Sequence, residues 1–258
     1  MVKTGSLRFS IVVPSFNQGQ FIGETIDSIL SQDYPNTEII VMDGGSTDNT
    51  VEILKSYGPR IQWVSQKDKG QAHALNMGLR KANGSIVAFL NSDDYYIKGA
   101  FEAVSVFFSR NPQRKWVTGD YYIINGSGKR MFSFVIWYKK LWRAFPTLFT
   151  LSITNFMIQP STFWRRELLD EIGFFNEDLH YAMDYDYWLR IMKKYQLSVI
   201  RKPLSAFRIH GGSKGGASYK KEFETDLGII TTHCDNKFLL KLHALHNWAI
   251  IKIYDHIK

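Results

Sequence analysis

The stretch of residues 85–94 constrains the fold most, because an apolar run ends there in a cluster of polar side chains. Residues 86–90 are β-branched, aromatic or aliphatic, which is typical of a strand buried on both faces of a parallel sheet. Asn91, Ser92, Asp93 and Asp94 follow directly. Ligands of open α/β sheets bind beyond the carboxyl ends of the strands. The stretch therefore predicts a buried strand with a binding site at its end.

The adjacent carboxylates of Asp93 and Asp94 indicate what such a site could hold. They repel each other unless a cation or a set of hydrogen-bond donors lies between them. Ser and Asp also cap helices well, so a helix N-terminus after the strand is the alternative interpretation. Because Ser92 and two carboxylates stand together at one strand end, we favour a site for a divalent metal and a nucleotide.

Strand and helix patterns alternate four times before residue 91, which predicts an α/β fold with parallel strands and right-handed crossovers. The strand-like runs are residues 9–13, 38–42, 61–64 and 86–90. Pro14 is expected to end the first run, because proline cannot donate to a strand ladder. Asp43, Asp68 and Asp93 with Asp94 follow strand-like runs, so we expect them at one edge of the sheet.

The alternation stops after residue 95, and the second half of the chain mixes strands and helices. Short strands are expected at residues 116–120, 122–124, 198–200 and 205–209, and a turn at 125–128 leads into a strand at 131–134. Helical spacing appears near residues 101–108, 168–172, 181–192 and 237–258. We expect one domain over residues 1–215, with halves of about 8–98 and 99–215, followed by a basic helical extension over 216–258.

Charge is concentrated near the C-terminal end. The net charge of the chain is +8, and residues 193–258 contribute 12 basic and 5 acidic residues, a balance of +7. An anionic partner would therefore meet this part of the chain. The basic helix carries no recognition motif, so we expect no nucleic-acid partner. The single cysteine, Cys234, is compatible with a reducing cytoplasm, and the chain opens without a leader segment, so a cytoplasmic location is expected.

Two stretches raise the question of a membrane. Residues 144–164 carry no charge but contain prolines and amides, so we expect them to be buried or interfacial and not to span a bilayer. Residues 137–143 interleave aromatic side chains with Lys139, Lys140 and Arg143, a composition that suits lipid headgroups. We expect peripheral attachment to the inner face of an anionic membrane. The alternative is that the aromatic side chains belong to the protein core and the basic side chains face solvent.

The ordered series of motifs resembles family 2 glycosyltransferases of the GT-A type over residues 10–213. The matching blocks are residues 12–17, 43–48, 68–70 with 74–76, 91–94, 159–165 and 184–188. The resemblance implies a GT-A fold, a Rossmann-like, mainly parallel mixed sheet flanked by helices. It also implies a nucleotide-sugar donor held at the strand ends.

The resemblance further assigns roles to individual residues. It places Asp43 at the ring N–H of the donor base and Asp68 beside base and ribose. The full set expected to contact the nucleotide-sugar is Pro14, Ser15, Asn17, Asp43, Asp68, Gln71, Asn91, Ser92 and Asp93. The expected metal ligands, for Mn²⁺ or Mg²⁺, are Asp94, Asp93 and His210. Asp184 matches the catalytic base, but Met183 stands where the family often has Glu, so Asp186 is a second candidate.

The chemistry of glycosyl transfer agrees with these residue types. A diphosphate leaving group gains charge as the glycosidic bond breaks, and an oxygen-ligated divalent cation neutralises it. The acceptor hydroxyl loses a proton as it attacks an oxocarbenium-like centre, which a positioned carboxylate assists.

We therefore expect an inverting, metal-dependent hexosyltransferase that uses a nucleotide-diphosphate-sugar, with UDP favoured, and a lipid-linked or surface-polysaccharide glycan as acceptor. A sugar-nucleotide nucleotidyltransferase is the first alternative, but residues 14–18 lack the Gly-rich, basic phosphate loop that it needs. A non-catalytic, basic nucleotide- or nucleic-acid-binding protein is the second.

Overall fold

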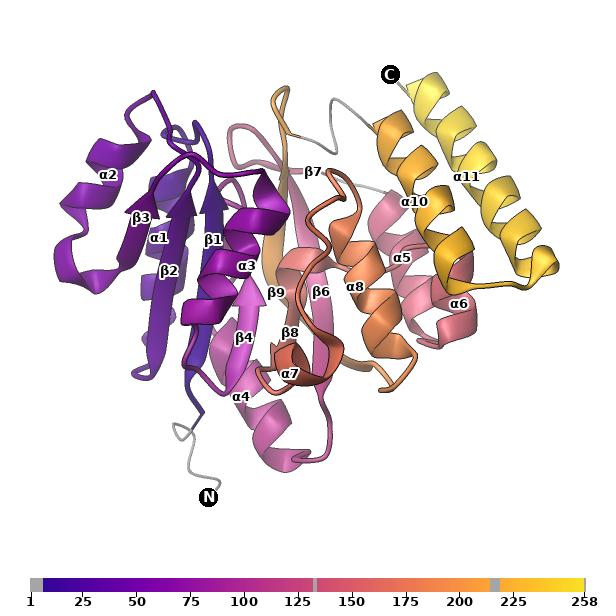
Figure 1. The fold of residues 1–258 in the computed structure, drawn as a ribbon, viewed down its shortest axis with the longest axis horizontal. Helices are drawn as coiled ribbons and strands as arrows, with labels where there is room; N and C mark the ends of the chain where they lie inside the picture. The colour runs from indigo at the N-terminus through magenta and orange to yellow at the C-terminus, as the bar shows by residue number, and fades with distance from the viewer. Residues whose placement is uncertain (1–6, 132–133, 214–218, 258) are drawn as a thin grey trace.

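The computed structural model describes residues 7–131, 134–213 and 219–257, which contain one nine-stranded mixed sheet (Figure 1). The strand order is β3-β2-β1-β4-β8-β6-β9-β5, and β7 pairs with β6. The pairs among β1 to β4 are parallel, whereas β8 runs antiparallel to both β4 and β6. The strands are β1 (Phe9–Ser15), β2 (Thr37–Asp43), β3 (Gln62–Ser65), β4 (Ile86–Phe89), β5 (Tyr95–Tyr96), β6 (Trp116–Asn125), β7 (Arg130–Met131), β8 (Thr162–Arg165) and β9 (Ser198–Ile209).

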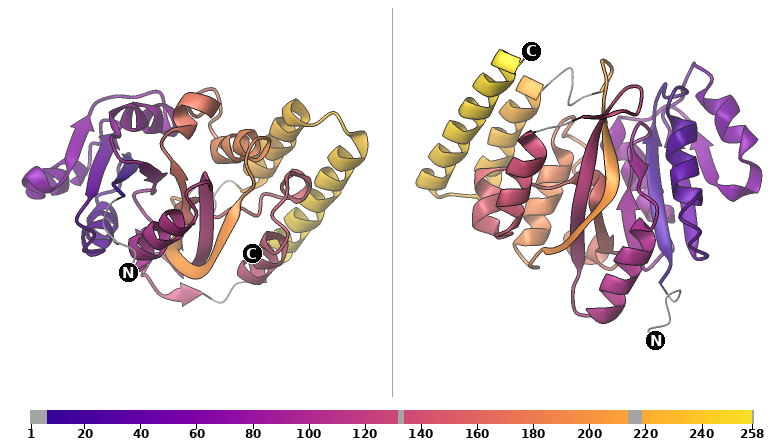
Figure 2. Two further views of the ribbon diagram at one scale, coloured as in Figure 1. Left: turned by 90° about the horizontal axis from the view of Figure 1, so that it is seen from below. Right: turned by 180° about the vertical axis from the view of Figure 1, so that it is seen from behind.

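Helices cover both faces of the sheet, as the α/β prediction requires. In β1, Phe9, Ile11 and Val13 enter one apolar core, while Val12 enters the other. This alternation explains why the central strands are apolar without interruption. The first core also takes side chains from α1 (Ile22–Leu30) and α4 (Ala100–Arg110), which Figure 2 shows from behind. The second core takes side chains from α3 (Gln71–Lys81), α7 (Leu168–Ile172) and α8 (Met183–Met192). At the β3 edge lie α2 (Thr50–Ser56) and a 3-10 turn (Gly58–Arg60).

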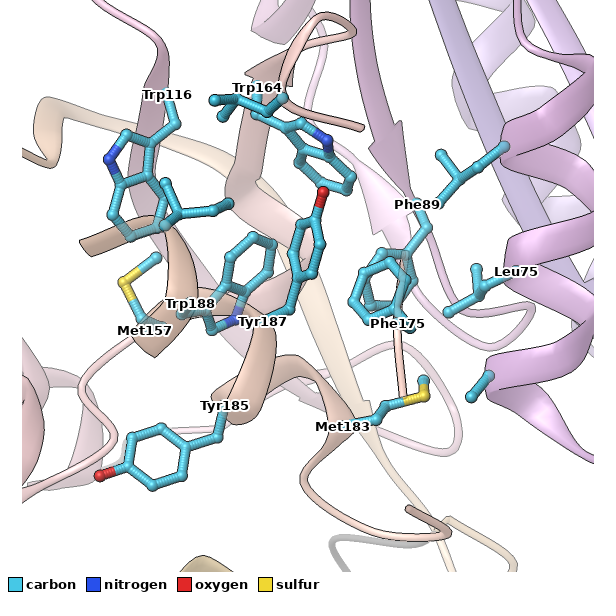
Figure 3. Packing of buried hydrophobic residues seen from close by; sticks show 14 of the residues in the cluster. Leu75, Phe89, Trp116, Met157, Trp164, Phe175, Met183, Tyr185, Tyr187 and Trp188 are labelled. Carbon is cyan, nitrogen blue, oxygen red and sulfur yellow. The ribbon is translucent and has the colours of Figure 1, made fainter. Parts of the chain in front are cut away.

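Large aromatic side chains fix α8 against the sheet (Figure 3). Trp188 of α8 stacks on Trp116 of β6, with ring centroids 5.8 Å apart, and meets Trp164 of β8 edge-on at 5.5 Å. All three tryptophans are completely buried. Because burial of large apolar side chains stabilises a core strongly, the position of α8, and with it Asp184, is set by this packing.

The structure corrects several expected boundaries. β1 continues through Pro14 to Ser15. The carbonyl of Val12 accepts a hydrogen bond from the end of β4, and Pro14, two residues later, faces the same neighbour. The pairing with β4 ends at Phe89, opposite Val12, so the missing N–H of Pro14 interrupts no hydrogen bond of the ladder. The short strands expected at 116–124 and 198–209 are the single strands β6 and β9, which pair in parallel across a register shift. Phe134 begins a helix, whereas a strand was expected there, and residues 132–133 lie outside the described ones.

The C-terminal helices pack against the second half of the domain. α10 (Tyr219–His233) contacts α8, and α11 (Lys237–Ile257) contacts α10 and α6 (Leu148–Ile153). Ile229 and Ile230 of α10 belong to the same apolar core as α3 and α8. The predicted division at residue 215 stays a prediction, since residues 214–218 are outside the described part. No helix in the described residues is long and apolar enough to cross a membrane.

The aromatic and basic stretch forms α5 (Phe134–Arg143), and its polar face does not point where we expected. The Nζ atom of Lys139 donates to the carbonyl of Met157 at 3.2 Å. Arg143 is 3% exposed and pairs with Asp120. The prediction that Lys139 and Arg143 face a membrane is therefore wrong, because each finds an acceptor inside the protein. Trp142 likewise packs against the core.

Candidate functional site

A cavity of about 600 Å³ opens at the carboxyl ends of β1, β4 and β9. The residues expected to contact a nucleotide-sugar that line it are Pro14, Ser15, Asp68, Gln71, Asn91, Ser92 and Asp93. They come from separate segments of the chain that only the sheet brings together. Their contacts with a ligand stay a prediction.

Asp43 and Asn17 lie beside this cavity and are absent from its lining. Asp43 is 2% exposed and accepts hydrogen bonds from two backbone N–H groups of the following loop and from the hydroxyls of Ser46 and Ser65. The side chain of Asn17 accepts from the backbone N–H of Thr47 at 2.8 Å. A carboxylate has about four acceptor positions, so in this arrangement Asp43 is occupied in holding the loop. Its contact with a base N–H stays an untested prediction.

Two glycines fix Asp68 at the cavity. Its Oδ1 atom accepts from the backbone N–H of Gly70 at 2.7 Å, and Gly70 has φ +114°, which favours glycine. A Cβ atom at Gly44 would lie 2.8 Å from Oδ2 of Asp68, so a larger residue there would push the carboxylate away. Both glycines therefore shape the approach to Asp68.

Asp93 and Asp94 differ sharply in their surroundings. Asp94 is 1% exposed, and its Oδ1 atom accepts from the backbone N–H of Arg208 at 2.8 Å. Burial raises the pKa of Asp94 well above its ordinary value, and the charge of Asp93 raises that pKa further. Asp93 lines the cavity, and its Oδ2 atom lies 3.1 Å from Nε2 of His210. Asp94 itself does not line the cavity. Its role as a metal ligand therefore stays a prediction, and this geometry does not favour it.

His210 is also absent from the cavity lining and lies behind Asp93, with which it is in contact. The donor types of Asp93 and His210 fit Mn²⁺ or Mg²⁺ bound together with a diphosphate. A carboxylate oxygen and an imidazole nitrogen both ligate Mn²⁺, and Mg²⁺ is held by one or two carboxylates with substrate phosphates and water. No group of three or more His, Cys, Asp or Glu that could hold a metal alone is found within the described residues. The remaining ligands would therefore come from the diphosphate and water.

A smaller cavity of about 140 Å³ adjoins the large one, and Asp184 lines it. Gln71, Asn91 and Phe207 line both cavities, so the two share a wall. Nε2 of Gln71 donates to Oδ1 of Asn91 at 2.8 Å, and Nδ2 of Asn91 donates to Oε1 of Gln159 at 3.2 Å. Gln159 is held in turn by the carbonyl of Phe89. This chain of amides fixes the boundary between the two cavities.

Asp184 sits in the first turn of α8, after a strained residue. Ala182 has φ +52°, an unusual backbone conformation for a residue other than glycine, and it turns the chain into the helix. Burial raises the pKa of Asp184, although backbone N–H groups and the nearby Lys139 act in the opposite direction. A cavity-facing carboxylate with a raised pKa has the properties of a general base.

Asp186, the second candidate base, is engaged in a structural ion pair. Its Oδ2 atom accepts from Arg190, with Nε at 3.0 Å and Nη2 at 2.9 Å, and its Oδ1 atom lies 2.8 Å from Nε2 of His233. Burial raises the pKa of Asp186, but the hydrogen bond of His233 and the charge of Arg190 outweigh it, so the pKa lies below its ordinary value. Asp186 is absent from the lining of both cavities, which favours Asp184 as the base.

Sequence reasoning missed three cavity residues with clear physical roles. Phe16, 59% exposed, offers an aromatic face at the end of β1. Nε of Arg208 donates to the carbonyl of Asp93 at 2.7 Å, and its guanidinium pairs with Glu24 of α1. Phe207 separates the two cavities. The available signal was their position at the ends of predicted strands, at residues 14–17 and 205–209.

Comparison with known proteins places this geometry in a family. The model of glycosyl transferase family 2 matches residues 10–173. The Escherichia coli protein WfgD, named UDP-Glc:alpha-D-GlcNAc-diphosphoundecaprenol beta-1,3-glucosyltransferase, is 29% identical over 256 residues, which cover 96% of this chain and 94% of that protein. An uncharacterized glycosyltransferase of Rickettsia prowazekii, RP339, is 30% identical over 78% of this chain.

Several relatives are longer than this chain. The matched region makes up 64% of the R. prowazekii protein and 40% of an uncharacterized glycosyltransferase of Rickettsia felis that is 28% identical. Among solved structures, residues 1–349 of Staphylococcus aureus TarS in complex with UDP-GlcNAc superpose with a TM-score of 0.70 at 21% identity, covering 93% of this chain and 71% of that one. The mannosyltransferase PcManGT from Pyrobaculum calidifontis, in complex with GDP-Man and Mn²⁺, superposes with a TM-score of 0.64 at 20% identity, covering 97% and 80%.

These likenesses to solved structures establish the GT-A fold, as expected from the motifs. The family model covers more than half of the chain and includes the ends of β1 and β4 at the larger cavity, whereas the end of β9 lies beyond the match. The chain belongs to glycosyl transferase family 2.

Proposed function

We propose that the chain is an inverting hexosyltransferase that moves a sugar from a UDP-sugar to a hydroxyl group of a lipid-linked glycan. The observation that carries this proposal is the pair of adjoining cavities, of about 600 and 140 Å³, with strand-end carboxylates in the larger and Asp184 in the smaller. A nucleotide-sugar in the larger cavity would direct its anomeric carbon toward the shared wall. The acceptor hydroxyl would then approach from the side of Asp184, opposite to the leaving diphosphate.

Inversion follows from this arrangement, because attack and departure take place on opposite faces of the sugar. Asp184 accepts the proton of the attacking hydroxyl, and its raised pKa suits this role near neutral pH. Phe16 stacks against the base of the donor. Gln71 and Asn91, fixed by their mutual hydrogen bond, orient the sugar at the shared wall.

Asp93 and His210 would hold a divalent cation with the donor diphosphate. The bound cation would neutralise the charge that develops on the leaving diphosphate. Arg208 holds the backbone of Asp93 and so keeps this carboxylate at the cavity. The presence of Mn²⁺ in the PcManGT complex supports the proposal of a metal.

The choice of donor and acceptor rests on the relatives. WfgD is named for a UDP-glucose donor and a GlcNAc-diphosphoundecaprenol acceptor, and it matches this chain over nearly its whole length. TarS was solved with UDP-GlcNAc and with UDP. Both support a uridine nucleotide here, and the name of WfgD supports a lipid-linked acceptor.

The decisive experiment incubates the chain with a panel of UDP-, dTDP- and GDP-sugars and measures slow hydrolysis of the donor. We expect one UDP-sugar to be hydrolysed, with Mn²⁺ or Mg²⁺ required and activity lost on chelation. Asp93→Asn should abolish the metal dependence of UDP binding in calorimetry, whereas Asp170→Asn, an exposed control on α7, should not. Absence of hydrolysis for every sugar nucleotide, together with no UDP binding, would refute the proposal.

A lipid-linked acceptor also requires access to a membrane surface, and we propose that the protein attaches peripherally to the cytoplasmic face of an anionic membrane. Phe134, Trp137 and Leu141 recur along one face of α5 and are each more than half exposed. The balance of +7 in residues 193–258 supports attraction to anionic lipid, at about 1 kcal/mol for each basic residue near the surface.

Vesicle sedimentation tests the attachment. The chain should sediment with vesicles that contain phosphatidylglycerol and stay in the supernatant with phosphatidylcholine alone, and salt should weaken the binding. Trp137→Ser should reduce the bound fraction. Equal recovery in the supernatant with both vesicle types would rule the attachment out.

A further inference from the structure

The smaller cavity has a wall that the family model does not reach. The match ends at residue 173, whereas Glu222 of α10 lines this cavity together with Asp184 of α8. Asp184 and Glu222 are 38 residues apart in sequence, and the packing of α10 against α8 brings them to one cavity. Nothing in the motifs indicated that the C-terminal helices contribute to a site.

The surroundings of Glu222 are charged and withdrawn from solvent. Lys139 of α5 lies among Glu222, Asp184 and Asp226, whose charges all act on its ammonium group. Asp226, one helical turn after Glu222, is 5% exposed, and its Oδ1 atom is buried without a hydrogen-bond partner in the described part of the chain. The charges of three carboxyl groups therefore act on one lysine, and two of these groups, Asp184 and Glu222, line the cavity.

Of the three acids only Asp226 is almost completely buried, and its unsatisfied oxygen costs free energy. Burial raises the pKa of Asp226 well above its ordinary value, and the charges of Glu222 and Asp184 raise it further. The smaller cavity itself is rich in hydrogen-bond acceptors, because the carboxyl groups of Asp184 and Glu222 and three side-chain amides line it. Carboxylates accept hydrogen bonds from hydroxyl groups, and a neutral sugar presents several of them.

We propose that Glu222 binds the acceptor sugar by accepting hydrogen bonds from its hydroxyl groups, and that Glu222 and Asp184 together select neutral sugar rings over uronic acids. The proposal rests on the proposed function of the chain as a glycosyltransferase. It extends that function by assigning acceptor recognition to α10 and by naming the class of acceptor. An acceptor sugar with a carboxylate on the ring that carries the reacting hydroxyl would meet the like charges of Asp184 and Glu222 in this cavity.

The test uses the full chain with its UDP-sugar, Mn²⁺ and p-nitrophenyl glycosides of glucose, N-acetylglucosamine, galactose and glucuronic acid as acceptors. Glu222→Gln keeps the size of the side chain but removes its charge. We expect it to raise the KM for neutral acceptors about tenfold, as loss of one charge-assisted hydrogen bond does, and to narrow the preference for neutral over acidic acceptors. Donor hydrolysis without acceptor should change less than about twofold.

Glu224→Gln is the matched control, because Glu224 lies on the same helix and is exposed. It should leave transfer, donor hydrolysis and thermal midpoint unchanged. Glu222→Ala should keep the thermal midpoint and lose more acceptor affinity than Glu222→Gln.

The outcomes separate this proposal from the proposed function. Donor hydrolysis with unchanged acceptor KM in both Glu222 variants would overturn the role of Glu222 and leave the glycosyltransferase intact. If the chain hydrolyses its donor but transfers the sugar to no glycoside of the panel, the recognition of neutral sugars in this cavity would be overturned. A wild-type chain that neither hydrolyses nor transfers any nucleotide-sugar would refute the proposed function and this proposal with it.

Discussion

Asp184 and Asp186 lie two residues apart on α8, and the structure predicts opposite consequences for their replacement by Asn. Asp184 faces the smaller cavity, and its raised pKa means that the folded chain holds this proton more tightly than the unfolded chain does. Its contribution to stability therefore falls as pH rises through the raised pKa and is unfavourable at pH 7.5. Asp186 has a lowered pKa, so its contribution is present at pH 7.5 and is lost only as pH falls through that pKa.

The magnitude for Asp186→Asn comes from its contacts. The carboxylate accepts from Arg190 at 3.0 and 2.9 Å and contacts His233 at 2.8 Å. Asn retains one acceptor oxygen and turns an amide N–H₂ group toward the other donor, so at least one charge-assisted hydrogen bond is lost, about 1.5–3 kcal/mol. Because the side chain of Arg190 is 25% exposed, water compensates part of this, and we expect about 2 kcal/mol. For a chain of this size that corresponds to a fall of about 4–8 °C in the thermal midpoint.

Asp184→Asn should behave in the opposite way. It removes the proton acceptor, so transfer should fall by roughly 10²-fold or more, with the KM for donor retained. It also removes a carboxylate whose charged form is penalised by burial, so the thermal midpoint at pH 7.5 should stay the same or rise.

Differential scanning fluorimetry and an initial-rate transfer assay, both at pH 7.5 and well below the melting temperature of each variant, measure the two effects. The opposite result would be that Asp186→Asn abolishes transfer without loss of stability, while Asp184→Asn retains transfer. It would refute the assignment of Asp184 as the base. In that case the base would be Asp186.

Three further predictions follow from the same structure. The rate of transfer should fall as pH drops through the raised pKa of Asp184, above the ordinary carboxylate range, and Asp184→Asn should flatten this limb of the pH–rate profile. Phe16→Ala should weaken UDP binding in calorimetry by about 1–3 kcal/mol through lost stacking, while Phe16→Tyr should retain it; equal affinities would exclude stacking at this position. Gly78→Ala should destabilise the fold by about 1–3 kcal/mol in denaturant titration, because its Cβ would lie 2.4 Å from Cγ1 of Val12. The control Gly228→Ala, which meets nothing within 4 Å, should instead stabilise the fold by about 0.5–1 kcal/mol.

The sequence alone predicted that several strand ends lie together at one edge of the sheet. The order of apolar runs and helical patterns is a local property, and parallel crossovers then place Asp68 and Asp93 at the same edge. The structure puts both on the larger cavity, although they are 25 residues apart. Element boundaries were less accurate, as β1 and the long strands β6 and β9 show, because where a strand ends depends on how far its neighbour pairs with it.

The inward or outward direction of polar side chains could not be read from the sequence. Lys139 and Arg143 are spaced like a solvated helix face, yet they turn toward Met157 and Asp120, which are distant in sequence. The periodicity of a sequence shows that a helix has an apolar and a polar face. It does not show which hydrogen-bond acceptors of other segments lie within reach of a long basic side chain.

The surroundings of Asp184 and Asp186 were decided by tertiary structure. Asp184 and Asp186 carry the same carboxylate on one helix, and only the positions of Arg190, His233 and the cavity give them opposite pKa shifts. In the same way, the backbone N–H of Arg208 donates to the buried carboxylate of Asp94 across 114 residues, while the neighbouring Asp93 lines the cavity. Hydrogen bonding and desolvation act through space at a few ångströms, so they depend on chain segments that no local pattern specifies.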